Sequence, residues 1–211
     1  MYAPAVSEDK ITDRPFYRSK GFELLVLIVV GVLVAAGVRT YLLQTFYIPS
    51  GSMENTLLLN DKVLVNKVLY RFREPHRGEV VVFQPPVAWG AGPAEQEYIK
   101  RIIGVGGDHV VCCDTQKRLT VNGQALDEDY LYPGDAPSDD TFDVTVPAGR
   151  LFVMGDHRSD SADSRAHLDS DLGTVPVDRV AGRAFAIYWP VSRWTSLSVP
   201  KTFEAVPAPA G

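Results

Sequence analysis

The sequence predicts a mainly β domain that follows one N-terminal membrane-spanning helix. Residues 24–38 form an uninterrupted run of uncharged, mostly apolar residues. Beyond residue 61 the apolar residues occur instead in short segments rich in β-branched side chains, separated by Gly and Pro. Many short strands joined by turns are typical of all-β and mainly β domains.

The composition excludes several classes of protein. The chain of 211 residues is long enough to bury a core, and its net charge of −5 without a basic stripe argues against a nucleic-acid partner. The two cysteines, Cys112 and Cys113, are adjacent, which is neither a disulfide framework nor a zinc-binding spacing. A vicinal disulfide and two free thiols both fit this pair.

The apolar run is the predicted membrane anchor. A span needs about 20 residues, and the run extends to residues 21–43 when Glu23 and Arg39 lie at the two interfaces. The polar tail of residues 1–20 carries four basic residues, so the positive-inside rule places the N-terminus in the cytoplasm. A cleaved signal peptide is one alternative. A buried core helix is another, disfavoured because the run is apolar on every face.

Nine short segments carry the predicted strands. They are residues 62–67, 79–83, 98–103, 109–112, 118–121, 124–126, 142–146, 151–154 and 183–188. Asn122-Gly123 predicts a type I′ hairpin turn. Residues 127–141 are acidic and turn-rich and predict a surface loop, and the Pro/Ala-rich residues 200–211 predict a disordered tail.

The first candidate for chemistry is the segment Pro-Ser-Gly-Ser-Met at residues 49–53. A serine hydroxyl needs a base and an oxyanion donor to react at neutral pH. Lys100 is the candidate base, because strand alternation puts it and Arg101 on opposite faces and suggests that one of the two is buried. Burial lowers the pKa of a lysine. The alternatives are an ordinary polar turn and an edge strand with two solvated charges.

A second polar cluster occupies residues 155–165, which hold three serines, three aspartates and two arginines directly after a predicted strand. Asp163 and Arg165 are spaced to form a bidentate ion pair that would brace a site. The alternative is a solvated loop.

Four segments in this order behind the anchor resemble the signature boxes of bacterial type I signal peptidases, the leader peptidases. They are Pro49–Met53, Arg77–Phe83, Tyr98–Arg101 with Gly104 and Gly107-Asp108, and Gly155–Arg165. The resemblance covers about residues 20–190. It implies a β catalytic core at residues 44–110 and 149–199 with a small β insertion at residues 111–148.

The resemblance also implies a Ser/Lys dyad. Ser52 would be the nucleophile that forms an acyl-enzyme, and Lys100 would be the general base and then the acid to the leaving amine. The Ser50 hydroxyl and the Ser52 backbone N–H would form the oxyanion hole, and Ser161 would donate a hydrogen bond to Lys100. Implied bracing ion pairs are Arg101 with Asp156 and Asp163 with Arg165, and implied walls of the substrate pockets are Ile48, Met53, Leu57 and Ile99.

By this resemblance the chain is expected to be a membrane-anchored serine endopeptidase that removes signal peptides after small residues of the Ala-x-Ala type. It would be a single-pass protein of the cell membrane with an extracytoplasmic catalytic domain. Its partners would be secretory preproteins and membrane lipid, with no metal, organic cofactor or nucleic acid. Two other classes stay open, an anchored β domain that binds exported partners without catalysis and a self-cleaving Ser/Lys repressor domain.

Two residues depart from the family's usual pattern. His157 stands where asparagine is usual, which raises a rival Ser52–His157–Asp triad. Gly106 stands where proline is common, which concerns only the stiffness of that loop. The remaining histidines are expected at the surface or in packing, and they are His76, His109 and His167.

Overall fold

The computed structural model describes residues 20–90 and 97–209, without the side chains of residues 38–41. The chain divides after residue 40 into two compact units. The first contains all but the last residue of helix α1, Lys20–Tyr41, whose 22 residues would extend about 33 Å at 1.5 Å per residue. Among the described residues, α1 is the one helix that is both long enough and apolar enough to cross a membrane. It ends two residues short of the predicted residue 43, because the chain turns into a strand.

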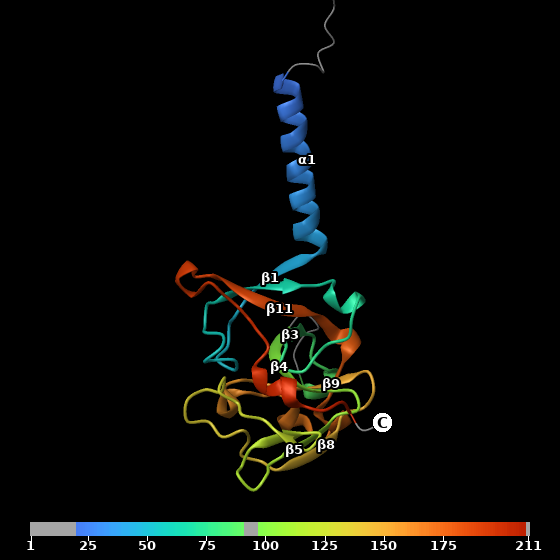
Figure 1. The fold of residues 1–211 in the computed structure, drawn as a ribbon, viewed down its shortest axis with the longest axis vertical. Helices are drawn as coiled ribbons and strands as arrows, with labels where there is room; N and C mark the ends of the chain where they lie inside the picture. The colour runs from blue at the N-terminus through green and yellow to red at the C-terminus, as the bar shows by residue number, and fades with distance from the viewer. Residues whose placement is uncertain (1–19, 91–96, 210–211) are drawn as a thin grey trace, which may run out of the picture. The chain divides into compact units, whose positions relative to one another are not determined.

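The second unit is built mainly of antiparallel strands, which confirms the predicted fold class (Figure 1). The larger sheet has the order β1-β2-β11-β3-β4-β9-β10, with β12 also paired to β11. Its strands are β1 Leu43–Tyr47, β2 Lys62–Asn66, β3 Val80–Phe83, β4 Tyr98–Val105, β9 Arg150–Met154, β10 Val175–Pro176, β11 Val180–Trp189 and β12 Thr195–Ser196. Strand β4 therefore lies inside the sheet, between β3 and β9.

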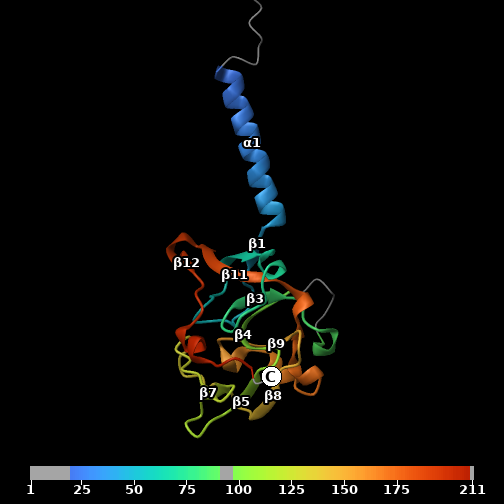
Figure 2. The same ribbon diagram turned by 45° about the vertical axis from the view of Figure 1, so that its right-hand side comes forward.

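A four-stranded sheet of order β7-β6-β5-β8 occupies most of the segment implied as the insertion. Its strands are β5 His109–Cys112, β6 Leu119–Val121, β7 Gln124–Ala125 and β8 Phe142–Thr145. Asn122 and Gly123 both have positive φ, as the predicted type I′ turn requires. Of the two states open for the cysteines, the structure has the Cys112–Cys113 disulfide. Both views of the β unit place this sheet at the end away from β1 (Figures 1 and 2).

Short 3-10 helices connect the strands. They are η2 Leu69–Arg71, η3 Val87–Trp89, η4 Arg158–Asp160, η5 Ser164–His167, η6 Asp171–Gly173, η7 Val177–Arg179, η8 Val191–Arg193 and η9 Lys201–Ala205. Helices η4 and η5 lie in the polar cluster at residues 155–165, so this cluster is an ordered turn rather than a free loop.

The C-terminal segment corrects the sequence analysis. The disordered tail predicted for residues 200–211 is wrong over residues 201–206, which contain η9. Phe203 and Val206 are buried in the same core cluster as the second sheet, and Phe203 stacks on Tyr130 with 6.2 Å between ring centroids. A Pro/Ala-rich composition is typical of disorder, but the burial of these two apolar side chains in the core orders the segment. Residues 210–211 lie outside the described part.

Three strands were missed, and all three are short or lie at an edge. Strand β1 covers the sheet edge beside β2, and β10 and β12 have two residues each. In β1 the apolar Leu43 and Phe46 do not alternate, so the period of two that marks a strand is absent. Such elements form because a neighbouring strand offers hydrogen bonds, which local sequence does not reveal.

Candidate active site

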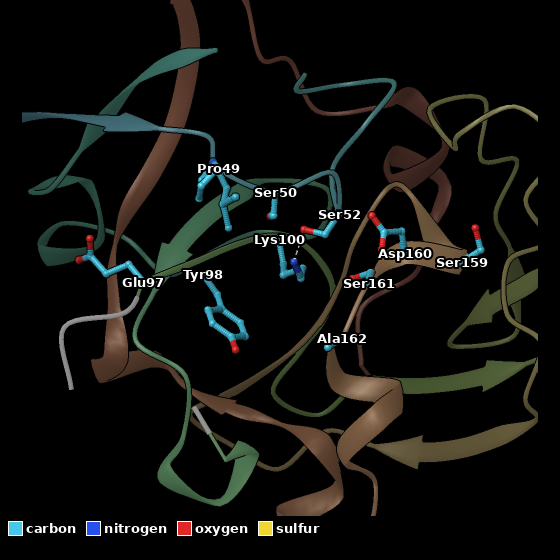
Figure 3. A pocket seen from close by; sticks show the side chains of 11 residues that line it. Pro49, Ser50, Ser52, Glu97, Tyr98, Lys100, Ser159, Asp160, Ser161 and Ala162 are labelled. Atoms are coloured by element: carbon cyan, nitrogen blue, oxygen red, sulfur yellow. Dashed lines mark hydrogen bonds between the residues drawn. The ribbon is translucent and has the colours of Figure 1, made fainter. Parts of the chain in front are cut away.

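Two buried side chains, Lys100 and Ser52, meet at the centre of the larger sheet. Lys100 is 4% exposed and Ser52 is 6% exposed. The Lys100 Nζ donates a hydrogen bond to Ser52 Oγ at 2.5 Å (Figure 3). Ser52 lies in a tight turn in which the Leu57 N–H donates to the Met53 carbonyl at 2.7 Å. Strand β4 and this turn thus bring together residues 48 positions apart in the sequence.

The surroundings of Lys100 favour the neutral amine. Burial lowers the pKa of Lys100 to about 8, against the opposing charges of the nearby carboxylates, chiefly Asp163, Asp156 and Asp160. Burial prevails because two of these carboxylates are already paired with arginines. A lysine with such a pKa exchanges its proton near neutral pH and meets the requirement for a general base.

Arg101 is the neighbour of Lys100 in β4. The sequence suggested that one of these two cations is buried, but in the structure both are buried. Arg101 is 2% exposed and Asp156 is 0% exposed. Arg101 Nε donates to Asp156 Oδ1 at 2.8 Å, and Nη2 donates to Oδ2 at 2.5 Å. The alternative of an edge strand with two solvated charges fails because both side chains are buried, and the buried Arg101 is paired with its own carboxylate, Asp156.

Asp163 accepts several of the hydrogen bonds that hold the polar cluster after β9 together. Its carboxylate accepts hydrogen bonds from Arg165 Nε at 3.0 Å and Nη2 at 2.9 Å, and from the Gly155 N–H at 2.9 Å. Burial acts to raise the pKa of Asp163, but the hydrogen bond and charge of Arg165 hold it below the usual value. The ion pairs implied for Asp163 and Arg165 and for Asp156 and Arg101 are both formed.

Ser161 lies beside the dyad, and all three side chains line one cavity (Figure 3). Its hydroxyl donates to Asp163 Oδ2 at 2.7 Å. A hydroxyl has one proton, so this contact leaves its lone pairs free to accept a hydrogen bond. Ser161 therefore does not fit the implied role of donor to Lys100, and it is suited instead to accept an amine N–H.

The dyad opens into a cavity of about 630 Å³. The cavity is lined by Pro49, Ser50, Ser52, Glu97, Tyr98, Ile99, Lys100, Ser159, Asp160, Ser161 and Ala162. Of the four implied pocket walls, Ile99 lines the cavity, whereas Ile48, Met53 and Leu57 are at most 1% exposed and pack in the core cluster that also contains Ile99. Sequence reasoning did not single out Tyr98, although strand alternation puts it on the same face as Lys100.

His157 contacts the turn that carries Ser52, but the described partner of the Ser52 hydroxyl is Lys100. The His157 N–H donates to the Ser52 carbonyl at 3.2 Å, and its ring Nδ1 lies 3.3 Å from the Gly51 carbonyl. This geometry favours the dyad over the rival triad. As expected, His109 is exposed, and His167 stacks on Trp89.

Within the described residues, no group of three or more His, Cys, Asp or Glu side chains is arranged to hold a metal ion. Two of the carboxylates near the dyad, Asp156 and Asp163, are paired with Arg101 and Arg165. Arg158, which is 4% exposed, also pairs with Glu128 at 2.5 Å and joins the 155–165 cluster to the loop before β8.

The chain is similar to known proteins over most of its length. A family model described as "Signal peptidase, peptidase S26" matches residues 21–189. Signal peptidase I of Mycobacterium tuberculosis is 38% identical over 226 residues, covering 86% of this chain and 76% of the relative. A probable signal peptidase I-2 of Synechocystis is 41% identical over 184 residues, covering 87% and 80%.

A crystal structure of a signal peptidase I from Enterococcus faecalis shares 28% identity at a TM-score of 0.40, covering 53% of this chain and 97% of that chain. The family model spans most of the chain, and the relatives of at least 35% identity match it over more than four-fifths of its length. This chain therefore belongs to the signal peptidase family, peptidase family S26.

Proposed function

We propose that this chain is a membrane-anchored serine endopeptidase that removes signal peptides from secretory preproteins by a Ser52/Lys100 dyad. Membership of the signal peptidase family supports the substrate class. The observation that carries the dyad is the buried contact of 2.5 Å between Lys100 Nζ and Ser52 Oγ, in a cavity that opens beside both residues.

The reaction begins when the neutral Lys100 amine takes the hydroxyl proton of Ser52 and Oγ adds to the scissile carbonyl carbon. The oxyanion accepts hydrogen bonds from the Ser52 N–H and the Ser50 hydroxyl. The Lys100 ammonium then gives its proton to the leaving amine, and an ester to Ser52 remains. Lys100 then takes a proton from water as the water oxygen attacks this ester, and the Lys100 ammonium returns a proton to Ser52 Oγ as the acyl group leaves as a carboxylic acid. Ser161, accepting an amine N–H, would aim the Lys100 lone pair at the Ser52 hydroxyl.

The substrate would bind as an added strand beside the start of β4. Strand β9 pairs with β4 only from Arg101 onward, so within the described residues the backbone of residues 98–100 has no strand partner on that side. An extended peptide fits such an open edge. Shallow walls such as Ile99 and Tyr98 would then leave room for small side chains before the cut, in keeping with the Ala-x-Ala preference.

Helix α1 would anchor the enzyme with its N-terminus in the cytoplasm and the catalytic domain outside. The support is its length and the basic residues before it. Trp189 and Trp194 are 51% and 71% exposed on the β domain, which suits contact with lipid headgroups.

The test of this function is cleavage, in detergent, of a preprotein with Ala-x-Ala before the cut. The full-length wild type is expected to release the signal peptide, whereas folded Ser52→Ala and Lys100→Ala variants are expected to release none. If the wild type binds the preprotein without cleaving it, and Ser52→Ala binds equally well, the chain is a binding domain. If only Lys100→Ala stays active, another base acts on Ser52.

The rate of cleavage is expected to rise with pH. Neutral Lys100 is the reactive form, and with a pKa of about 8 its fraction increases from about 1% at pH 6 to about one half at pH 8, or about 50-fold in kcat/KM. Initial rates on a peptide substrate between pH 5.5 and 10 would measure this. An acid limb with its midpoint near 6.5, the ordinary pKa of histidine, would point to a histidine base instead.

Replacement of Gly155 with alanine is expected to lower kcat/KM by about 100-fold, because a displacement near 1 Å can have this effect on a positioned nucleophile. An added Cβ would overlap Ser161 Oγ and the Ser52 carbonyl, so one of the two segments must move. Gly31→Ala is the matched control, because nothing lies within 4 Å of its Cβ. Near-normal kinetics for Gly155→Ala would mean that the two segments need no such close approach.

A further inference from the structure

The peptide group between Gly51 and Ser52 has a special position in the proposed mechanism, because its N–H is an oxyanion donor. A peptide group is planar, so the direction of the Gly51 carbonyl determines the opposite direction of the Ser52 N–H. Whatever holds the Gly51 carbonyl therefore also aims the oxyanion donor. The Gly51 carbonyl accepts two hydrogen bonds, from the Glu54 N–H at 2.8 Å and from the ring of His157.

The ring nitrogen of His157 that faces this carbonyl must carry a proton. Nδ1 lies 3.3 Å from the Gly51 carbonyl and 3.4 Å from Glu54 Oε2. A carbonyl oxygen only accepts hydrogen bonds, and an ionised carboxylate does the same, so Nδ1 between them is the donor. This assignment excludes Nδ1 as the acceptor of a proton from Ser52.

The His157 ring is itself held in place. It stacks on Tyr132 with 3.9 Å between ring centroids and 14° between planes. Its side chain is 15% exposed, and its backbone N–H donates to the Ser52 carbonyl. His157 thus binds the peptide groups on both sides of Ser52, one through the ring and one through the backbone.

We infer that His157 is a positioning residue that aims the Ser52 N–H at the oxyanion through the Gly51 carbonyl, an inference that rests on the proposed function. The ring is expected to stabilise the transition state and not to affect substrate binding, because the hydrogen bond from the Ser52 N–H becomes strong only when the carbonyl oxygen gains charge. The role requires a hydrogen-bond donor at this position and does not require a group that titrates.

The test compares His157→Phe with His157→Asn in the full-length enzyme, using a peptide substrate with Ala-x-Ala before the cut. Phenylalanine keeps the stack on Tyr132 and lacks the donor, and asparagine offers an amide donor. His157→Phe is expected to lower kcat by about 10- to 100-fold with KM within about 2-fold, whereas His157→Asn keeps kcat within about 3-fold of wild type. The acid limb near pH 8 should persist in both variants.

A peptide aldehyde ending in alanine provides a second measurement. Ser52 Oγ–H adds across its C=O bond to give a hemiacetal whose oxygen occupies the oxyanion position. The inhibition constant is expected to rise in His157→Phe by the factor by which kcat/KM falls. His109→Asn, an exposed histidine on β5, is the control and is expected to behave as wild type.

Three results would overturn the inference. The first is a folded His157→Phe variant with normal kcat, and the second is a His157→Asn variant as impaired as His157→Phe. The third is a pH–rate profile that loses its acid limb near pH 8 when the His157 ring is replaced. If His157→Phe does not fold, as judged by its thermal unfolding, Tyr132→Ala takes its place, and a kcat equal to wild type then contradicts the role. Failure of the wild type to cleave the peptide substrate, or full activity of Lys100→Ala, would instead refute the proposed function on which the inference rests.

Discussion

Replacement of Lys100 with methionine is expected to abolish cleavage and at the same time to stabilise the folded protein. Loss of the base should reduce kcat by at least about 10³-fold, since only the oxyanion donors and substrate binding remain. Methionine has a similar length and no charge, so it fills the same buried space at the end of the cavity.

The stabilisation follows from the depressed pKa. Lys100 has a pKa of about 8 in the folded protein, against 10.5 for a free lysine side chain. The unfolded chain therefore holds the proton more tightly, and folding is disfavoured by about 3 kcal/mol below pH 8. The loss of the hydrogen bond to Ser52 offsets about 1 kcal/mol of the gain.

The sign of this effect gives it a definite pH dependence. The destabilisation that Lys100 causes in the wild type is complete below pH 8 and disappears as the pH rises toward 10.5. The gain in the free energy of unfolding of Lys100→Met should therefore be largest at pH 7 and small at pH 10. Urea unfolding of both full-length proteins in detergent at the two pH values measures it. A Lys100→Met variant less stable than wild type at pH 7 would contradict the burial of a destabilising charge. Lys201→Met, on an exposed lysine, is the control.

Replacement of Arg101 with methionine is expected to lower the free energy of unfolding by about 3–5 kcal/mol, because it leaves a buried carboxylate without its cation. Asp156 is 0% exposed, and after the change its described partner is the Thr56 hydroxyl, at 2.5 Å. The same guanidinium also donates to the Gly78 carbonyl at 2.8 Å and lies over the Tyr130 ring at 4.3 Å.

Two variants sharpen this experiment. Arg101→Lys keeps the charge but lacks the planar fork, so it should recover only part of the stability. The double variant Arg101→Met/Asp156→Leu removes both charges and is expected to be more stable than Arg101→Met alone, which a double-mutant cycle would measure. If Arg101→Met unfolds in urea at the same midpoint as wild type, the pairing of Asp156 with Arg101 does not stabilise the fold.

The sequence was a good guide where a residue's role depends on its immediate neighbours along the chain. The β-branched segments predicted β2, β3, β4, β5 and β9 to within two residues at each end. Alternation within β4 predicted opposite faces for Lys100 and Arg101, and the two side chains bind different partners, Ser52 Oγ and Asp156. The order of the four motifs indicated the family, which the comparisons confirm.

The sequence was a poor guide where a role depends on which group lies opposite. Ser161 was expected to donate to Lys100, yet its hydroxyl donates to Asp163, two residues along. His157 was considered as a base, yet its ring meets the Gly51 carbonyl, 106 residues away in sequence. A hydroxyl or an imidazole can act as donor or acceptor, and only its three-dimensional partners select between the two.

By itself, the sequence determined the apolar helix, the β class of the domain and the residue types of the site, because periodicity and motif order are local properties. Only the tertiary structure decided that both Lys100 and Arg101 are buried, that the segment around Phe203 is ordered, and that Lys100 reaches Ser52. Each of these depends on a strand or side chain brought in from a distant part of the chain, since burial, and with it the pKa of Lys100, is a property of the packed sheet.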